Sequence, residues 1–250
     1  MRPARPEFVP DADLTREGME RLQRRVADAA TFADDLPADP GAVGSAAGPV
    51  VAGVDQAFLG DDRAVSAVVC WRGGTVVERT HAVADLELPY VPGLLSFREG
   101  VPALDAFATL DVDPDLALVD GSGRIHFRQA GLATHLGVAL DLPTVGVAKG
   151  LLCGTPREAV GGRPEGWRTP IEVRPDDDVD APVGTTLGYA YQSRQYDGSP
   201  RVNPLYVSPG HRVGAGTAVD LVAACCRGYK LPEPTRLADA HADAVKAEYG

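Results

Sequence analysis

The order of its apolar runs constrains the fold of this chain most. Three β-branched runs come first and are joined by short turns, of which Arg72-Gly73-Gly74 is the clearest. Runs joined in this way pair as antiparallel strands. Shorter apolar runs then alternate with segments of helical periodicity, which is typical of an α/β sheet. We therefore predict an α/β fold whose mixed sheet has three antiparallel strands, then parallel strands, and is flanked by helices. The strands are predicted at residues 50–58, 64–71, 75–84, 116–119, 144–148, 184–192 and 205–208.

The rest of the chain is organised around this sheet. A length of 250 residues with 44% hydrophobic content suits one globular domain, residues 1–250. An N-terminal helix is expected at 11–36. A segment rich in Gly, Pro and Asp, 154–183, is predicted to be a loop-rich insertion with one strand near Ile171. Further helices are predicted at residues 101–109, 129–140, 217–227 and 236–248.

Acidic residues end two of the apolar runs. Asp55 ends the first apolar run and Asp120 the fourth, while Glu99 follows a proline-rich loop. Ligands of open α/β sheets bind at strand ends, where a buried carboxylate must be solvated, paired or bound to a cation. Carboxylates clustered without matching basic residues indicate a site for Mg²⁺ or Mn²⁺ and phosphodiester chemistry. The alternatives are turn acids for Asp55 and Asp120, and a helix N-terminal charge for Glu99.

Four segments around these acids resemble the endonuclease V family, over about residues 49–237. They are AGVDQAF, PYVPGLLSFREG, DGSGRIHFRQAGLATHLGVALDLPTVGVAKGLLCG and YVSPGHRV followed by GYKLPEPTRLAD. The resemblance implies a ribonuclease H-like fold and a Mg²⁺-dependent DNA repair endonuclease, with Mn²⁺ as a substitute. It implies cleavage of the second phosphodiester bond 3′ to deoxyinosine, which leaves 3′-hydroxyl and 5′-phosphate ends.

The resemblance also implies roles for individual residues. Asp55 and Asp120 match the two central metal aspartates of the family, and Glu99 would complete the site. Asp239 matches a position that holds an acid or a histidine, so it is a candidate fourth ligand, or else an exposed helix acid. Lys149 matches the family lysine and would act on the scissile phosphate or the attacking water. The alternative for Lys149 is an ion pair with one of the acids.

The PYVPG segment carries the hypothesis of base recognition. Pro89 and Pro92 stiffen a short loop around Tyr90 and Val91. A rigid loop with an aromatic tip can enter a base stack without a large ordering cost. The resemblance implies that this loop separates the strands beside a flipped base. The alternative is a tyrosine packed on the surface of the protein.

Glycines and histidines near these motifs are further candidates for DNA contacts. Gly53, Gly121 and Gly123 permit a close approach of backbone and base, although such glycines are a weak signal. His126 lies near the phosphate by resemblance or only supports the site. The family has Pro after this histidine, whereas Phe127 stands here. His211 follows a predicted strand, so it either reaches the site or caps the next helix.

The charge composition is unusual for a protein that binds DNA. The net charge is −11, with 24 Asp, 11 Glu and 21 Arg but only three Lys. This composition indicates adaptation to high internal salt, with a GC-rich genome as the alternative. At high salt an acidic protein can still bind DNA, because repulsion and attraction are both screened.

Other features bear on location and partners. The four cysteines lack CxxC spacing, no apolar run reaches the roughly 18 residues of a membrane span, and the N-terminus lacks a hydrophobic leader segment. We expect a monomer of the cytoplasm, with no membrane partner. Its expected partner is DNA containing deoxyinosine or other deaminated bases. The alternatives are a ribonuclease specific for inosine RNA, and a non-catalytic protein that binds inosine or damaged strands.

Overall fold

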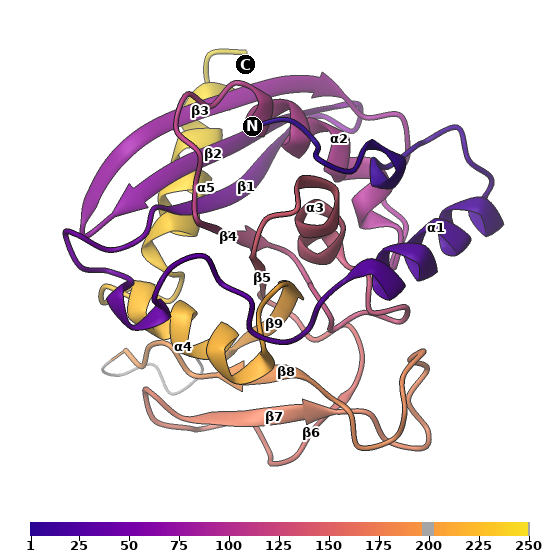
Figure 1. Cartoon of the computed structure of the whole chain (residues 1–250), viewed down its shortest axis with the longest axis vertical. Coiled ribbons are helices and arrows are strands. Elements are labelled where there is room, and N and C mark those ends of the chain that lie inside the picture. The colour runs from indigo at the N-terminus through magenta and orange to yellow at the C-terminus, as the bar shows by residue number, and fades with distance from the viewer. Residues whose placement is uncertain (197–202, 250) are drawn as a thin grey trace.

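The computed structural model describes residues 1–196 and 203–249. Their strands form one nine-stranded mixed sheet (Figure 1). The strand order is β3-β2-β1-β4-β5-β9-β8-β7-β6. The strands are β1 (Val51–Leu59), β2 (Arg63–Arg72), β3 (Thr75–Asp85), β4 (Leu116–Asp120), β5 (Thr144–Ala148), β6 (Thr155–Pro156), β7 (Arg168–Glu172), β8 (Thr186–Tyr191) and β9 (Leu205–His211).

The sheet has the mixed order expected from the sequence. Strands β1, β2 and β3 are antiparallel, and β1, β4 and β5 run parallel to one another. Beyond β5 the sheet continues with antiparallel strands, because β9 pairs with β5 and β8. The segment 154–183 was expected to hold one strand, but it contributes β6 and β7 to this edge. The insertion therefore extends the sheet instead of forming surface loop alone.

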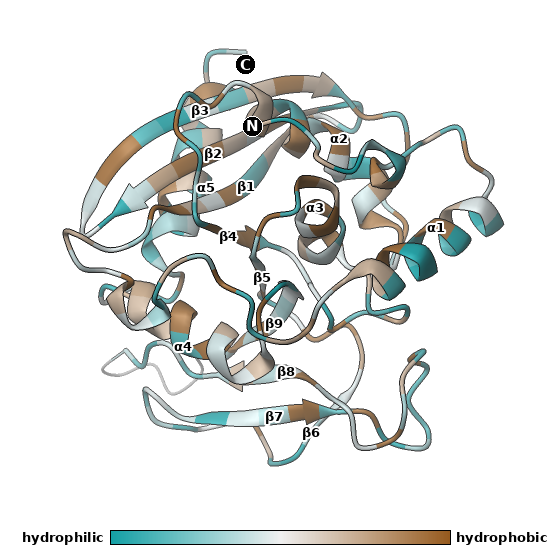
Figure 2. Ribbon diagram, viewed as in Figure 1, coloured by the Kyte–Doolittle hydropathy of each residue, from teal (hydrophilic) through white to brown (hydrophobic). Residues whose placement is uncertain are grey.

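Helices cover both faces of the sheet. The side chains of Val54 and Val119 pack against α2 and α3, whereas those of Val51 and Val145 pack against α4. Helix α5 covers β1 and β2 on the α4 side. Figure 2 shows the consequence: α3 is hydrophobic, while β3 at the sheet edge alternates between hydrophilic and hydrophobic residues. The helices are α1 (Arg16–Ala29), α2 (Leu95–Ala108), α3 (Leu132–Leu140), α4 (Ala215–Cys225) and α5 (Glu233–Lys246), with 3₁₀ turns η1 (Pro6–Phe8) and η2 (Pro40–Ala42).

Helix α1 is shorter than the predicted range of 11–36. Thr15 caps its N-terminus by accepting a hydrogen bond from the Gly18 amide, and Ala30 is already extended. The apolar residues Met19, Leu22 and Val26 face a small core beside α3. Helix α1 thus lies outside α3 (Figure 1). It packs against the segment before α2, which contains Val91 and Leu94.

Two helix starts differ from the prediction in ways that matter for the site. Helix α2 begins at Leu95 and contains Pro102, whereas the sequence placed its start near residue 101. Glu99 is therefore inside the helix, and no acidic residue occupies the first turn. Helix α3 begins at Leu132 instead of residue 129, because Gln129 adopts a left-handed conformation with φ 53°. Among the described residues, we find no helix long and apolar enough to cross a membrane.

Candidate active site

The strand register brings Asp55 and Asp120 together. Val54 of β1 pairs with Val119 of β4 in parallel register. The next residue of each strand is an aspartate, so the two acids project from adjacent strands at the same level. Neighbouring strands lie about 4.8 Å apart. β4 ends at Asp120, whereas β1 continues past Asp55 to Leu59, so the expectation that each acid ends a strand holds for Asp120 alone.

Two further acids reach the same cleft from helices on opposite faces of the sheet. Glu99 comes from α2, whose backbone is tied to β1 because the Gln56 side-chain amide donates to the Glu99 carbonyl oxygen at 2.8 Å. Asp239 comes from α5. The cleft has a volume of about 550 Å³. It is lined by Asp55, Gln56, Phe58, Gly60, Asp61, Tyr90, Leu95, Arg98, Glu99, Asp120, Gly121, Lys149 and Asp239.

Burial and repulsion make two of the carboxylates unusually basic. Burial, reinforced by the charge of Asp120, raises the pKa of Asp55 to about 8. Burial also raises the pKa of Glu99 to about 7, although Arg98 opposes the shift. Within the described part of the chain, the buried Asp55 Oδ2 has no hydrogen-bond partner. An unpartnered carboxylate oxygen facing other carboxylates is the donor chemistry that Mg²⁺ or Mn²⁺ would satisfy.

The acids line one cleft, but their carboxylates do not all point to one common position. Within residues 1–196 and 203–249, no three His, Cys, Asp or Glu side chains already form a metal centre. Mutual repulsion keeps carboxylates apart, and Asp120 is turned toward Lys149, whose Nζ lies 2.6 Å from Asp120 Oδ2. Burial lowers the pKa of Lys149, but the adjacent Asp120 carboxylate outweighs it and raises that pKa. The ion-pair alternative for Lys149 is thus the geometry present.

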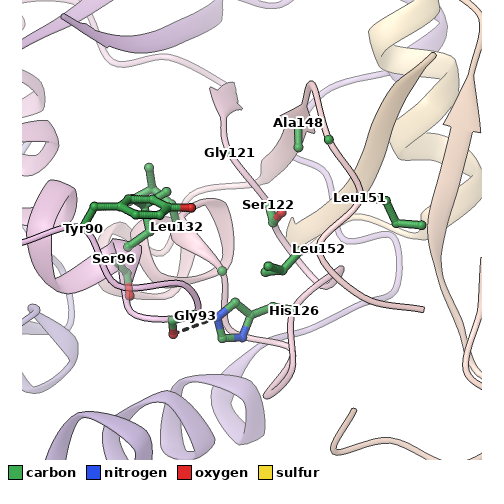
Figure 3. A pocket seen from close by; sticks show the side chains of 13 residues that line it. Tyr90, Gly93, Ser96, Gly121, Ser122, His126, Leu132, Ala148, Leu151 and Leu152 are labelled. Atoms are coloured by element: carbon green, nitrogen blue, oxygen red, sulfur yellow. Dashed lines mark hydrogen bonds between the residues drawn. The ribbon is translucent and has the colours of Figure 1, made fainter. Parts of the chain in front are cut away.

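A second pocket adjoins the acidic cleft and shares Tyr90, Leu95 and Gly121 with it. Its volume is about 330 Å³, and its walls combine leucine side chains with exposed backbone of glycine segments (Figure 3). Pockets of this kind, largely apolar with a few polar groups, bind flat organic groups. The lining residues are Tyr90, Gly93, Leu95, Ser96, Gly121, Ser122, His126, Gly131, Leu132, Ala148, Gly150, Leu151 and Leu152.

The PYVPG loop stands between the cleft and this pocket. Tyr90 is 64% exposed and lines both spaces. Val91 instead packs on the core that contains Leu22 and Phe97, so it anchors the loop. The amide of Leu94 donates to the Val91 carbonyl oxygen at 3.0 Å, which closes a tight turn. Pro89 and Pro92 are exposed beside Tyr90. The loop therefore presents one aromatic side chain on a braced backbone.

His126 is buried at the base of the pocket, with both ring nitrogens engaged. Its Nε2 lies 3.1 Å from the Gly93 carbonyl oxygen, drawn as a dashed line in Figure 3, and its Nδ1 accepts from the Arg128 amide at 3.1 Å. An Nδ1 that accepts requires the proton on Nε2. Burial lowers the pKa of His126 to about 4, so the ring is neutral near pH 7. His126 thus supports the pocket wall and is not poised as a phosphate cation.

Of the three candidate glycines, only Gly121 faces the site. It lines both spaces with φ 149°, a conformation that favours glycine. A Cβ at Gly53 would lie 2.0 Å from the Pro234 carbonyl oxygen, so this glycine lets the start of α5 approach β1. A Cβ at Gly123 would meet the Pro209 carbonyl oxygen at 2.4 Å. Gly53 and Gly123 therefore serve packing.

The structure places His211 away from both spaces. His211 pairs in register with Thr144 at the start of β5, whereas Lys149 follows the end of that strand. Its Nδ1 accepts from the Thr31 amide at 3.1 Å, and its Nε2 lies 3.3 Å from Asp141 Oδ1. The predicted contact of His211 with the site is thus not realised, because β9 runs antiparallel to β5 and its last residue lies beside the start of β5, at the end of the strands opposite to the cleft.

Gln56 and Arg98 line the cleft but were not predicted from the sequence, although each is the neighbour of a predicted ligand. Gln56 follows Asp55, and its amide N–H donates to Asp55 Oδ1 at 2.7 Å. Arg98 precedes Glu99 and donates to the Leu88 carbonyl oxygen at 2.6 Å, which ties α2 to the PYVPG loop. A polar residue directly beside each predicted ligand was the available signal.

We expect Asp55→Asn to change how the stability of the metal-free protein depends on pH. The folded chain holds the Asp55 proton up to about pH 8, whereas the ordinary pKa of an aspartate is 3.8. The unfolded chain releases it first, so parent stability falls as pH rises through this window. The variant has no such loss, and should melt above the parent near pH 9, by a margin that narrows toward pH 4. Thermal melts in EDTA measure it; a margin constant with pH would contradict it.

Comparison with known proteins gives consistent sequence matches. A family model described as endonuclease V matches residues 42–240. The endonuclease V of Natronomonas pharaonis is 62% identical over 249 residues, which cover 99% of this chain and 98% of that protein. The match therefore includes the segments that carry Asp55, Glu99, Asp120 and Asp239.

Solved structures show the same fold. Endonuclease V from Streptomyces avermitilis superposes with a TM-score of 0.79 at 33% identity, covering 96% of this chain and 97% of that one. Endonuclease V of Ciona intestinalis, in complex with a 24mer DNA containing an inosine followed by a ribo-adenosine, gives 0.72 at 24% identity, covering 92% and 97%; that likeness concerns the fold. Together with the acid-lined cleft, these matches lead to one conclusion: this chain belongs to the endonuclease V family of nucleases.

Proposed function

We propose that this nuclease nicks DNA at the second phosphodiester bond 3′ to deoxyinosine, with Mg²⁺ or substituting Mn²⁺, and leaves 3′-hydroxyl and 5′-phosphate ends. One observation carries the proposal: the acidic cleft and the apolar pocket share a wall made by Tyr90, Leu95 and Gly121. A base held in the pocket would therefore leave the adjoining backbone beside the carboxylates.

Asp55, Asp120, Glu99 and Asp239 would hold the cation. When bound, it supplies an activated water and stabilisation of the leaving 3′-oxygen. The chain itself supplies a positive charge beside the cation site and the contacts that hold its carboxylates in place. Lys149 brings an ammonium to the edge of the cleft, where it stabilises negative charge on the phosphate. The half-buried contact from the Gln56 side chain to the Glu99 carbonyl oxygen ties this part of α2 to β1 beside Asp55.

The apolar pocket suits a base that has left the stack. Its leucine walls offer contact to a flat ring, and the backbone around Gly121 and Ser122 offers hydrogen-bonding groups to the ring edge. An enzyme that extrudes a base reads that edge directly and need not read the groove. Unpaired or mismatched bases cost least to extrude, which favours deaminated bases such as hypoxanthine.

The test is cleavage of a labelled duplex containing one hypoxanthine, against the same duplex with adenine. We expect one nick, at the second bond 3′ to the lesion, with Mg²⁺ and none with EDTA. Equal cleavage of both duplexes would contradict the proposal. Faster cleavage of the matched inosine RNA would favour the ribonuclease, and selective binding without a nick would favour a non-catalytic binder.

Tyr90→Ala is expected to weaken binding of inosine DNA more than it slows the chemical step. Stacking of a base on an aromatic ring contributes about 1–3 kcal/mol, so we expect a loss of affinity of about 5- to 150-fold. Fluorescence titration with inosine and adenine duplexes measures it. Tyr249→Ala, an exposed tyrosine beyond α5, is the matched control. An unchanged affinity for inosine DNA would mean that Tyr90 only covers the protein surface.

The setting of the reaction follows from the same features. All four cysteines are free. Reduced thiols suit the cytoplasm, where we place this activity. We propose a monomer as the working form, because both the cleft and the pocket are complete within one chain.

A further inference from the structure

The last residue of the PYVPG loop is held in place by two side-chain hydrogen bonds to its carbonyl oxygen. The Gly93 carbonyl oxygen accepts from two buried side chains: Gln23 Nε2 at 2.8 Å and His126 Nε2 at 3.1 Å. Gln23 belongs to α1, about seventy residues earlier in the chain, and its side chain is fully buried. One loop carbonyl thus receives donors from two distant segments.

The orientation of the Gln23 amide is fixed by a second contact. Arg128 Nη1 donates to Gln23 Oε1 at 3.2 Å. A guanidinium only donates, so the amide oxygen must face Arg128 and the amide NH₂ must face Gly93. Arg128 is in turn held by Glu20 of α1, with Nη2 2.8 Å from Glu20 Oε1. The relay from Glu20 through Arg128 and Gln23 ends on the loop.

The opposite end of the loop is held separately. Arg98 of α2 donates to the Leu88 carbonyl oxygen at 2.6 Å. Between the two fixed carbonyls stands Tyr90, exposed at the shared wall of the cleft and the pocket. Gly93 itself lines the pocket, with φ 79°. A shift of the Gly93 carbonyl would therefore move the pocket wall and the base of the tyrosine loop together.

We propose that Gln23 is a positioning residue for base recognition: through the Gly93 carbonyl it holds the PYVPG loop in the conformation that receives the base. This inference rests on the proposed function. Binding to a loop that is already ordered avoids the entropy cost of ordering it. Gln23 lines neither the cleft nor the pocket, so its effect passes through the lining residue Gly93.

Three variants separate this role from general stability. Gln23→Met has nearly the same volume but loses the donor to Gly93 and the acceptor for Arg128. Gln23→Glu keeps an oxygen for Arg128, yet places a second acceptor against the Gly93 carbonyl oxygen. If Gln23 served only to hold Arg128, Gln23→Glu would behave as the parent. Arg21→Gln is the matched control on α1, because its ion pair with Glu17 is exposed and local.

Two measurements decide the proposal in the full-length protein at molar KCl. The first is hydrogen exchange of the Leu94 amide, which bonds to Val91 within the loop. The second is DNA binding and cleavage: the affinity for the hypoxanthine duplex, the affinity for the adenine duplex, and the single-turnover rate of nicking at saturating duplex. For Gln23→Met and Gln23→Glu we expect loop exchange about tenfold faster, tenfold weaker inosine binding, unchanged adenine binding and a single-turnover rate within about threefold.

Parent-like loop exchange or parent-like inosine affinity in both variants would overturn the proposal. So would an equal loss of affinity for the two duplexes, since that indicates general damage. Melting curves check the fold, and if Gln23→Met is unstable the Arg128-compatible Gln23→Glu decides alone. If the parent shows no preference for inosine, the proposed function fails, whereas loop exchange still decides whether Gln23 holds the loop.

Discussion

Asp55→Asn and Asp120→Asn should each lower nicking of the hypoxanthine duplex by about a thousandfold or more. A bound cation contributes several kcal/mol of transition-state stabilisation, and each 1.36 kcal/mol is tenfold in rate. Each substitution keeps the shape of the side chain but removes one carboxylate from the pair on the adjacent strands β1 and β4. Single-turnover nicking at saturating Mg²⁺ measures the loss.

The fold must survive for this loss to be informative. Burial already raises the pKa of Asp55 to about 8, so its charge is unfavourable in the metal-free protein and neutral Asn should not destabilise it. Binding of the hypoxanthine duplex in EDTA should persist, because the pocket lining contains neither acid. Asp105→Asn, an exposed acid on α2, is the control for a lost charge. Either variant nicking within tenfold of the parent would remove that residue from the metal site.

The strands near the N-terminus were predictable because local and global signals agree there. Strands β1, β2 and β3 lie within one residue of the predicted ends, since three β-branched runs joined by short turns leave few other pairings. The meeting of Asp55 and Asp120 was predictable for the same reason. Parallel neighbours that pair in register up to Val54 and Val119 must place the next residue of each strand side by side.

The rest depended on tertiary packing that no local pattern encodes. Helix α2 runs through Pro102 and begins at Leu95, whereas the helix predicted from residue 101 left Glu99 outside it. The direction of β9 places His211 beside the start of β5, at the end of the strands opposite to the cleft. Gln23 reads only as a polar residue on an amphipathic helix, and its contact with Gly93 exists because α1 folds back over the loop.

The acidic composition leads to a large expected effect of salt on stability. With net charge −11 and only three lysines, unscreened repulsion opposes the compact state. At about 1 M salt the Debye length falls to roughly 3 Å, so this repulsion fades. We expect the melting temperature to rise steeply between about 0.1 M and 3 M KCl, and nicking to persist at the upper end. Thermal melts and nicking assays across the series measure both.

A charge variant distinguishes screening from other effects of salt. Asp176 and Asp178 are exposed in the extended insertion, close together in the sequence. Neutralising both to Asn should raise the melting temperature at about 0.1 M KCl and leave it unchanged at 3 M, where repulsion is already screened. The same screening weakens phosphate contacts, so inosine binding at high salt must depend on the apolar pocket, Tyr90 and the cation site. Best stability and activity at the dilute end would refute adaptation to salt, and a GC-rich genome would then be the simpler cause of the missing lysines.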